Sequence, residues 1–207
     1  MPSSLVITRP FSDITTSYLH RWSLKSVKYA RSKIRSVADL DGKRANKKEL
    51  TSVLLKVKPD LVVLNGHGAP DFICGERDEI LIKVGVNEHI LKGAIVYVLS
   101  CSTARILGIE SMKAGAKAYI GYIEDFIFLI SDNYSTKAEM DPLAKLFLEP
   151  TEIIVESLID GYSPKDSHQR GLDLFNRNLE NTLLSGSRDQ YVTRFLIWNM
   201  SSQICYD

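Results

Sequence analysis

A histidine and a cysteine each follow an apolar run of strand length. His67 comes just after the run 61–64, and Cys101 comes just after the run 95–99. A thiol becomes a strong nucleophile as the thiolate, and a nearby imidazole can take its proton and later protonate a leaving amine. The two residues therefore predict nucleophilic catalysis by Cys101, with His67 as its acid-base partner.

The backbone around the pair offers groups that could stabilise the developing charges. Gly68, beside the histidine, lets a substrate carbonyl approach the main chain closely. The N–H groups of Gly68 and Cys101 are accordingly the predicted oxyanion donors. A helix predicted over residues 103–113 would place its N-terminal end near Cys101, where it favours a thiolate by about 0.3–1 kcal/mol.

Each residue also has a structural interpretation when it is taken alone. His67 could be held in a glycine turn, and Cys101 could be a small buried hydrophobe. The other thiols, Cys74 and Cys205, are predicted to be inert. The chain has no Cys-x-x-Cys motif, and its four histidines are far apart in sequence, so we expect no metal site and no organic cofactor.

The elements that must position the pair alternate between strands and helices. Continuous apolar runs, rather than alternating ones, are typical of strands covered on both faces. The sequence predicts an α/β three-layer sandwich with a mostly parallel sheet, in which sites form beyond the carboxyl ends of the strands. Strands are predicted at 5–7, 37–42, 61–64, 80–84, 94–99 and 118–122, and helices at 15–36, 47–56, 103–113, 142–147, 152–160 and 165–184. The run 195–198 could be an edge strand or a buried helix turn.

Length and composition fit one domain spanning residues 1–207. Apolar residues make up 44% of the chain and charged residues 25%, and the net charge is +1, which does not favour nucleic acid or an anionic membrane as a partner. Basic residues cluster between Lys25 and Lys48, which we interpret as a solvated surface. With no signal peptide, no membrane span and few scattered cysteines, we expect a cytoplasmic protein.

The blocks LVVLNGHG and IVYVLSCS, in this order, resemble the signature of the caspase-like cysteine peptidases. The stretch GAKAYIG at 115–121 is similar to the strand that follows the cysteine in CHAT-domain and gingipain-type members. The resemblance covers roughly residues 60–125. It implies a caspase-like fold and an endopeptidase that forms a thioester acyl-enzyme with a His67–Cys101 dyad. The caspase pentapeptide is absent, and Leu99 replaces the acidic residue that metacaspases carry two positions before their cysteine.

The resemblance also implies where substrate specificity arises. Members of this clan often build the pocket from the loops after the first strand and after the post-cysteine strand. Those loops hold Asp13, Glu124 and Asp125, together with Arg9, and an acidic pocket would select Arg or Lys. The alternative for Asp13 is that it caps the helix that follows it. The alternative for Glu124 and Asp125 is that they are ordinary loop charges.

Two other functions remain open from the sequence. The fold could be a catalytically silent scaffold that acts as a binding or signalling module, or another cysteine hydrolase or transferase on a similar sheet. The expected partners of an active enzyme are a protein or peptide substrate and, for regulation, a partner protein or a second copy of the chain.

Overall fold

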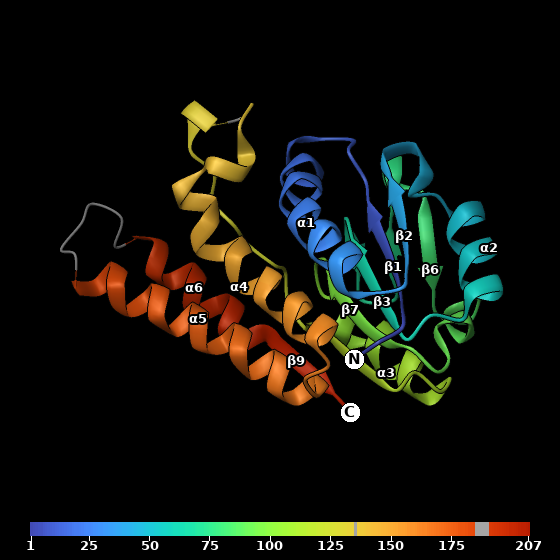
Figure 1. The fold of residues 1–207 in the computed structure, drawn as a ribbon. Helices are drawn as coiled ribbons and strands as arrows, with labels where there is room; N and C mark the ends of the chain where they lie inside the picture. The colour runs from blue at the N-terminus through green and yellow to red at the C-terminus, as the bar shows by residue number, and fades with distance from the viewer. Residues whose placement is uncertain (135, 185–190) are drawn as a thin grey trace.

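The structure, a computed structural model, describes residues 1–134, 136–184 and 191–207. The strands of its central sheet are β1 (Ser4–Arg9), β2 (Ser36–Asp41), β3 (Leu61–Asn65), β7 (Ile95–Leu99), β8 (Ala118–Tyr122) and β9 (Gln203–Tyr206). Their order is β2-β1-β3-β7-β8-β9 (Figure 1). The first five run parallel, and β9 pairs antiparallel with β8 at one edge. The predicted α/β class with a mostly parallel sheet is confirmed.

Helices cover both faces of this sheet. They are α1 (Ile14–Lys33), α2 (Lys47–Val57), α3 (Leu107–Lys113), α4 (Pro142–Asp160), α5 (Pro164–Leu184) and α6 (Thr193–Ser202). Figure 1 shows α1 and α4 on one side of the sheet and α2 on the other, with α5 and α6 outside α4. A small antiparallel sheet of β4 (Gly68–Ala69), β5 (Phe72–Cys74) and β6 (Ile80–Lys83) joins α2 and α3 on their side.

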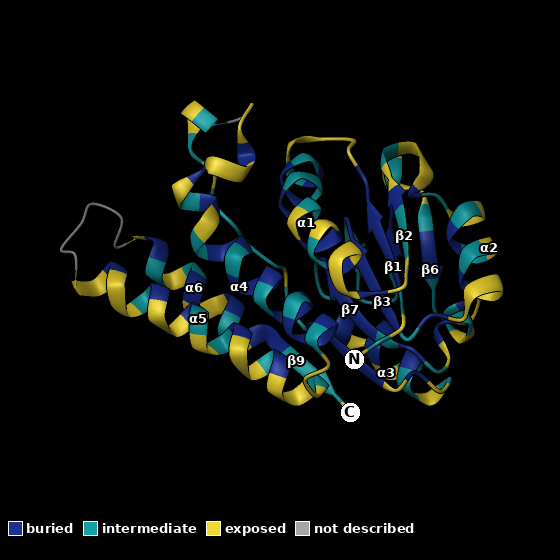
Figure 2. Ribbon diagram, viewed as in Figure 1, coloured by how far each residue is buried: buried dark blue, intermediate teal, exposed yellow. Residues whose placement is uncertain are grey.

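Alternate side chains of each core strand enter opposite cores. Leu61 and Val63 pack with α1 and α4, whereas Val62 and Leu64 pack with α2 and α3. All four are at most 1% exposed, and β3 is dark blue in Figure 2. This two-sided burial explains why the run is continuous rather than alternating.

The helix predicted over residues 103–113 is broken, which corrects the sequence interpretation. A 3-10 turn spans Thr103–Arg105, and α3 begins only at Leu107. Ser102 is left-handed, at φ 55°, and the Leu107 N–H donates to the Pro70 carbonyl at 2.8 Å instead of to the preceding turn. No α-helix therefore begins directly after Cys101, and the predicted stabilisation of a Cys101 thiolate by a helix dipole is not supported.

Two further differences lie in the C-terminal half, and a third lies at residues 66–75. The two helices predicted at 142–147 and 152–160 are one helix, α4, which continues through Pro150 because its apolar face is buried on the sheet. The run 195–198 lies inside α6, so the edge-strand alternative is wrong, and the edge strand is β9. The hairpin β4–β5 lies in the glycine-rich stretch 66–75, where no strand was predicted.

In the part of the chain that the structure describes, no helix has the length and apolar character needed to span a bilayer.

Candidate active site

The sheet order sets three strand ends side by side. β3 lies between β1 and β7, with Thr8 opposite Leu64 and Asn65 opposite Leu99. The loops that leave β1, β3 and β7 carry Asp13, His67 and Cys101, respectively. All three therefore lie at the carboxyl edge of the sheet, where parallel α/β folds place their sites.

The turn that carries His67 depends on glycine at two positions. Gly66 has φ +151°, and a Cβ there would lie 2.2 Å from the Cys74 carbonyl oxygen. A Cβ on Gly68 would lie 2.8 Å from the Ser100 hydroxyl and from the Thr103 methyl group. The histidine loop is thus packed directly against the cysteine loop, with no room for a larger residue between them.

His67 and Cys101 line the same cavity, of about 360 Å³, which we call the His67–Cys101 cavity. The other lining residues are Ile14, Thr15, Asp125, Phe126, Ile127, Phe128 and Ile130. The imidazole is accessible, with 41% of its side chain exposed, and Cys101 is half-buried. The arrangement can bring a thiol, an imidazole and a bound ligand together.

Asp13 has two roles in this structure. It caps α1 by accepting a hydrogen bond from the Thr16 N–H at 2.8 Å, which confirms the capping alternative. Its other carboxylate oxygen lies 2.7 Å from His67 Nε2. Partial burial raises the pKa of the Asp13 carboxyl, but the bonds from Thr16 and His67 outweigh burial and leave that pKa below its usual range. The contact with His67 was missed from the sequence, and only the neighbouring positions of β1 and β3 could have suggested it.

The Cys101 thiol is disfavoured as a thiolate in this state. Burial raises its pKa, and the nearby Asp125 carboxylate raises it further, while the Phe126 backbone lowers it. The Ser102 N–H donates to the Glu124 carbonyl at 3.0 Å and is therefore engaged away from any substrate. Burial raises the pKa of Cys74 and of Cys205 to about 11, which fits their predicted inertness.

The three acidic residues predicted to form a pocket are placed differently from one another. Only Asp125 lines the His67–Cys101 cavity, and it accepts a hydrogen bond from the Ser102 hydroxyl at 2.9 Å. Glu124 lies outside the lining and forms an ion pair with Arg105. Arg9, named with these loops, is buried and bonded to Asp39 at 2.8 Å, so it holds β1 to β2.

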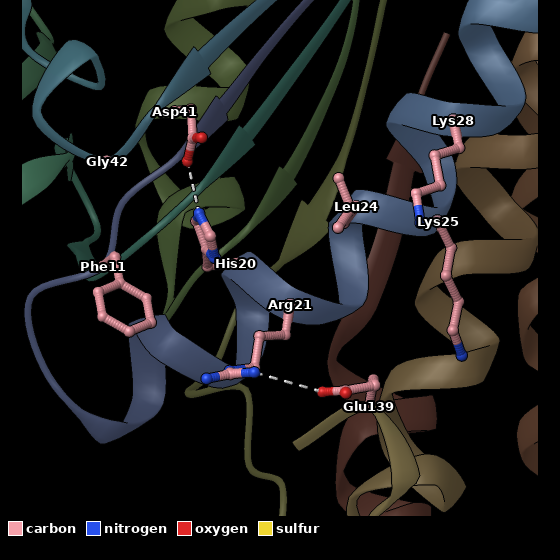
Figure 3. A pocket seen from close by; sticks show the side chains of 9 residues that line it. All are labelled: Phe11, His20, Arg21, Leu24, Lys25, Lys28, Asp41, Gly42 and Glu139. Atoms are coloured by element: carbon pink, nitrogen blue, oxygen red, sulfur yellow. Dashed lines mark hydrogen bonds and ion pairs between the residues drawn. The ribbon is translucent and has the colours of Figure 1, made fainter. Parts of the chain in front are cut away.

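A larger cavity, of about 690 Å³, lies on the outer face of α1 (Figure 3). Its histidine, His20, is paired with Asp41 at 2.5 Å, and Arg21 is paired with Glu139 at 3.7 Å. None of its described lining residues is a cysteine, so these residues offer no thiol chemistry. Within the described ranges, no group of three His, Cys, Asp or Glu side chains is placed to hold a metal ion.

No family model matches the sequence, and no curated protein matches it either.

Proposed function

We propose that the protein is a cysteine endopeptidase with a caspase-like fold, in which Cys101 is the nucleophile and His67 the acid-base residue. The observation that carries this proposal is that both side chains line one cavity at the carboxyl edge of a parallel sheet. The strand order, which sets β3 and β7 next to each other, supports it.

Asp13 supplies the orientation that such a pair needs. A carboxylate at Nε2 favours the tautomer with hydrogen on Nε2, which leaves Nδ1 as the nitrogen that accepts a proton. The carboxylate also stabilises the imidazolium that forms after proton transfer. Asp13 acts through His67 and is therefore a positioning residue.

The reaction proceeds through a thioester. His67 takes the Cys101 proton as the sulfur attacks the scissile carbonyl, and the N–H groups of Gly68 and Cys101 stabilise the oxyanion. Collapse of the tetrahedral intermediate breaks the C–N bond, and His67 protonates the leaving amine. Water then attacks the thioester and releases the second product. Because burial and Asp125 raise the thiol pKa, we expect the proton to leave during attack rather than from a resting thiolate.

A thiol-directed peptidyl probe tests the proposal. Wild type should be labelled and should cleave peptides, whereas Cys101→Ala should do neither. Cys205→Ala is the matched control, because Cys205 is also a half-buried free thiol but lies on β9, and it should behave as wild type. A folded wild-type protein that resists labelling would instead support the catalytically silent scaffold.

Three free thiols fit a reducing compartment, so we also propose a cytoplasmic location and a protein or peptide substrate. Of the three acidic residues from which the sequence predicted a preference for Arg or Lys, Asp125 alone lines the His67–Cys101 cavity, so that preference would require Asp125.

A further inference from the structure

We infer that the His67–Cys101 cavity binds an apolar side chain of the substrate, next to the bond that is cut. This inference depends on the proposed endopeptidase function and names the substrate class of the same site.

The lining of the cavity is mainly apolar. Five of its nine residues are hydrophobic: Ile14, Phe126, Ile127, Phe128 and Ile130. They come from the start of α1 and from the segment that follows β8, so the two walls belong to different parts of the chain. Ile14 is 48% exposed and Ile130 is 38% exposed. A bound apolar side chain would remove both surfaces from water, which is the main source of affinity in such pockets.

The wall after β8 is held in place by α6. The buried Asn199 side chain accepts from the Ile127 N–H at 3.0 Å and donates to the Ile127 carbonyl at 2.6 Å. Trp198 Nε1 donates to the Asp125 carbonyl at 2.8 Å. The Phe126 ring packs on the Tyr122 ring at 4.8 Å. The pocket is therefore formed before substrate arrives, and binding requires little ordering of this wall.

The charges near the cavity already have partners. Asp13 is bonded to Thr16 and His67, and Glu124 is paired with Arg105. Asp125 remains, and its carboxylate already accepts from the Ser102 hydroxyl. Asp125 is thus the single acidic side chain among the nine described lining residues, five of which are apolar. No lysine or arginine lines the cavity within the described residues, so the lining offers no permanent positive charge to an acidic side chain.

The experiment compares rates of Cys101 labelling by peptidyl probes that differ only in the residue next to the reactive group: Leu, Arg or Asp. The Leu probe should react at least about tenfold faster than the other two, the scale on which an apolar pocket discriminates. The variant Ile130→Ser should reduce this ratio about fivefold. Ile109→Ser is the control, because Ile109 is also 38% exposed but lies on α3 outside the cavity, and it should leave the ratio unchanged.

The outcomes separate this inference from the proposed function. Faster reaction of the Arg or Asp probe, still dependent on Cys101, overturns the inference and leaves the endopeptidase standing. A Leu preference that Ile130→Ser does not change overturns the assignment to this cavity. Failure of all three probes to label Cys101 in folded protein overturns the proposed function and the inference together.

Discussion

Glu152 makes the stability of this protein fall as the pH rises through neutrality. The residue lies on α4, is 7% exposed, and accepts a hydrogen bond from the Ser26 hydroxyl on α1 at 2.5 Å. Burial raises its pKa from 4.5 to about 8, against the opposing effect of the Ser26 bond. The folded protein therefore keeps the proton over a range where the unfolded chain has lost it. The stabilisation that comes from protonated Glu152 is complete below pH 4.5 and is lost as the pH approaches 8.

The size of the stability loss follows from how far the pKa of Glu152 is raised. A pKa difference of one corresponds to about 1.4 kcal/mol, so the loss between pH 4.5 and 8 is at most about 5 kcal/mol. Burial lowers the pKa of His168 from 6.5, which makes stability rise with pH in the range below that value. The interval from pH 6.5 to 8 lies above that range, and there we expect Glu152 to cause a loss of about 2 kcal/mol.

Urea unfolding followed by far-UV circular dichroism, at several values between pH 6.5 and 8, measures this loss. Glu152→Gln keeps the shape and an acceptor for Ser26 but cannot ionise, so its stability should be nearly flat across the interval. Glu149→Gln, on the same helix but in a surface ion pair with Lys145, should keep the wild-type slope. Equal slopes in wild type and Glu152→Gln would refute the argument.

Three further predictions concern variants of residues around the His67–Cys101 cavity. Asp13→Asn keeps a helix cap but removes the carboxylate charge beside His67, so the rate of peptide cleavage should fall at least about tenfold while the free energy of unfolding changes by less than about 1 kcal/mol. Glu76 accepts from the Phe11 N–H at 2.6 Å and so ties down the loop that carries Asp13. Glu76→Ala should lower the cleavage rate a few-fold and Glu76→Gln should restore it, whereas equal effects would exclude this tie. Asp125→Asn should lower the Cys101 pKa, so that alkylation by iodoacetamide begins at lower pH; an unchanged pH profile would argue against this contribution.

The core strands could be predicted because their sequences report two-sided burial directly. The runs 61–64 and 95–99 hold large apolar residues at every position, and both lie inside the sheet as β3 and β7. Once two parallel strands were expected, the position of chemistry at their carboxyl ends followed from a general rule of such folds. The apolar pattern could not reveal β9, because its four residues follow α6 without a break and three of them are only partly buried.

The contact between Asp13 and His67 could not be predicted, and the reason lies in Asp13 itself. A local signal, an acidic residue just before an apolar helical stripe, already accounts for its identity, since it caps α1. The sequence held no further signal that indicated the bond between Asp13 and His67. That bond depends on β1 lying next to β3, which is a property of strand order and not of either strand's own residues. A capping role that explains a side chain locally can thus conceal a second contact, and capping residues that follow core strands should be checked against the neighbouring strand ends first.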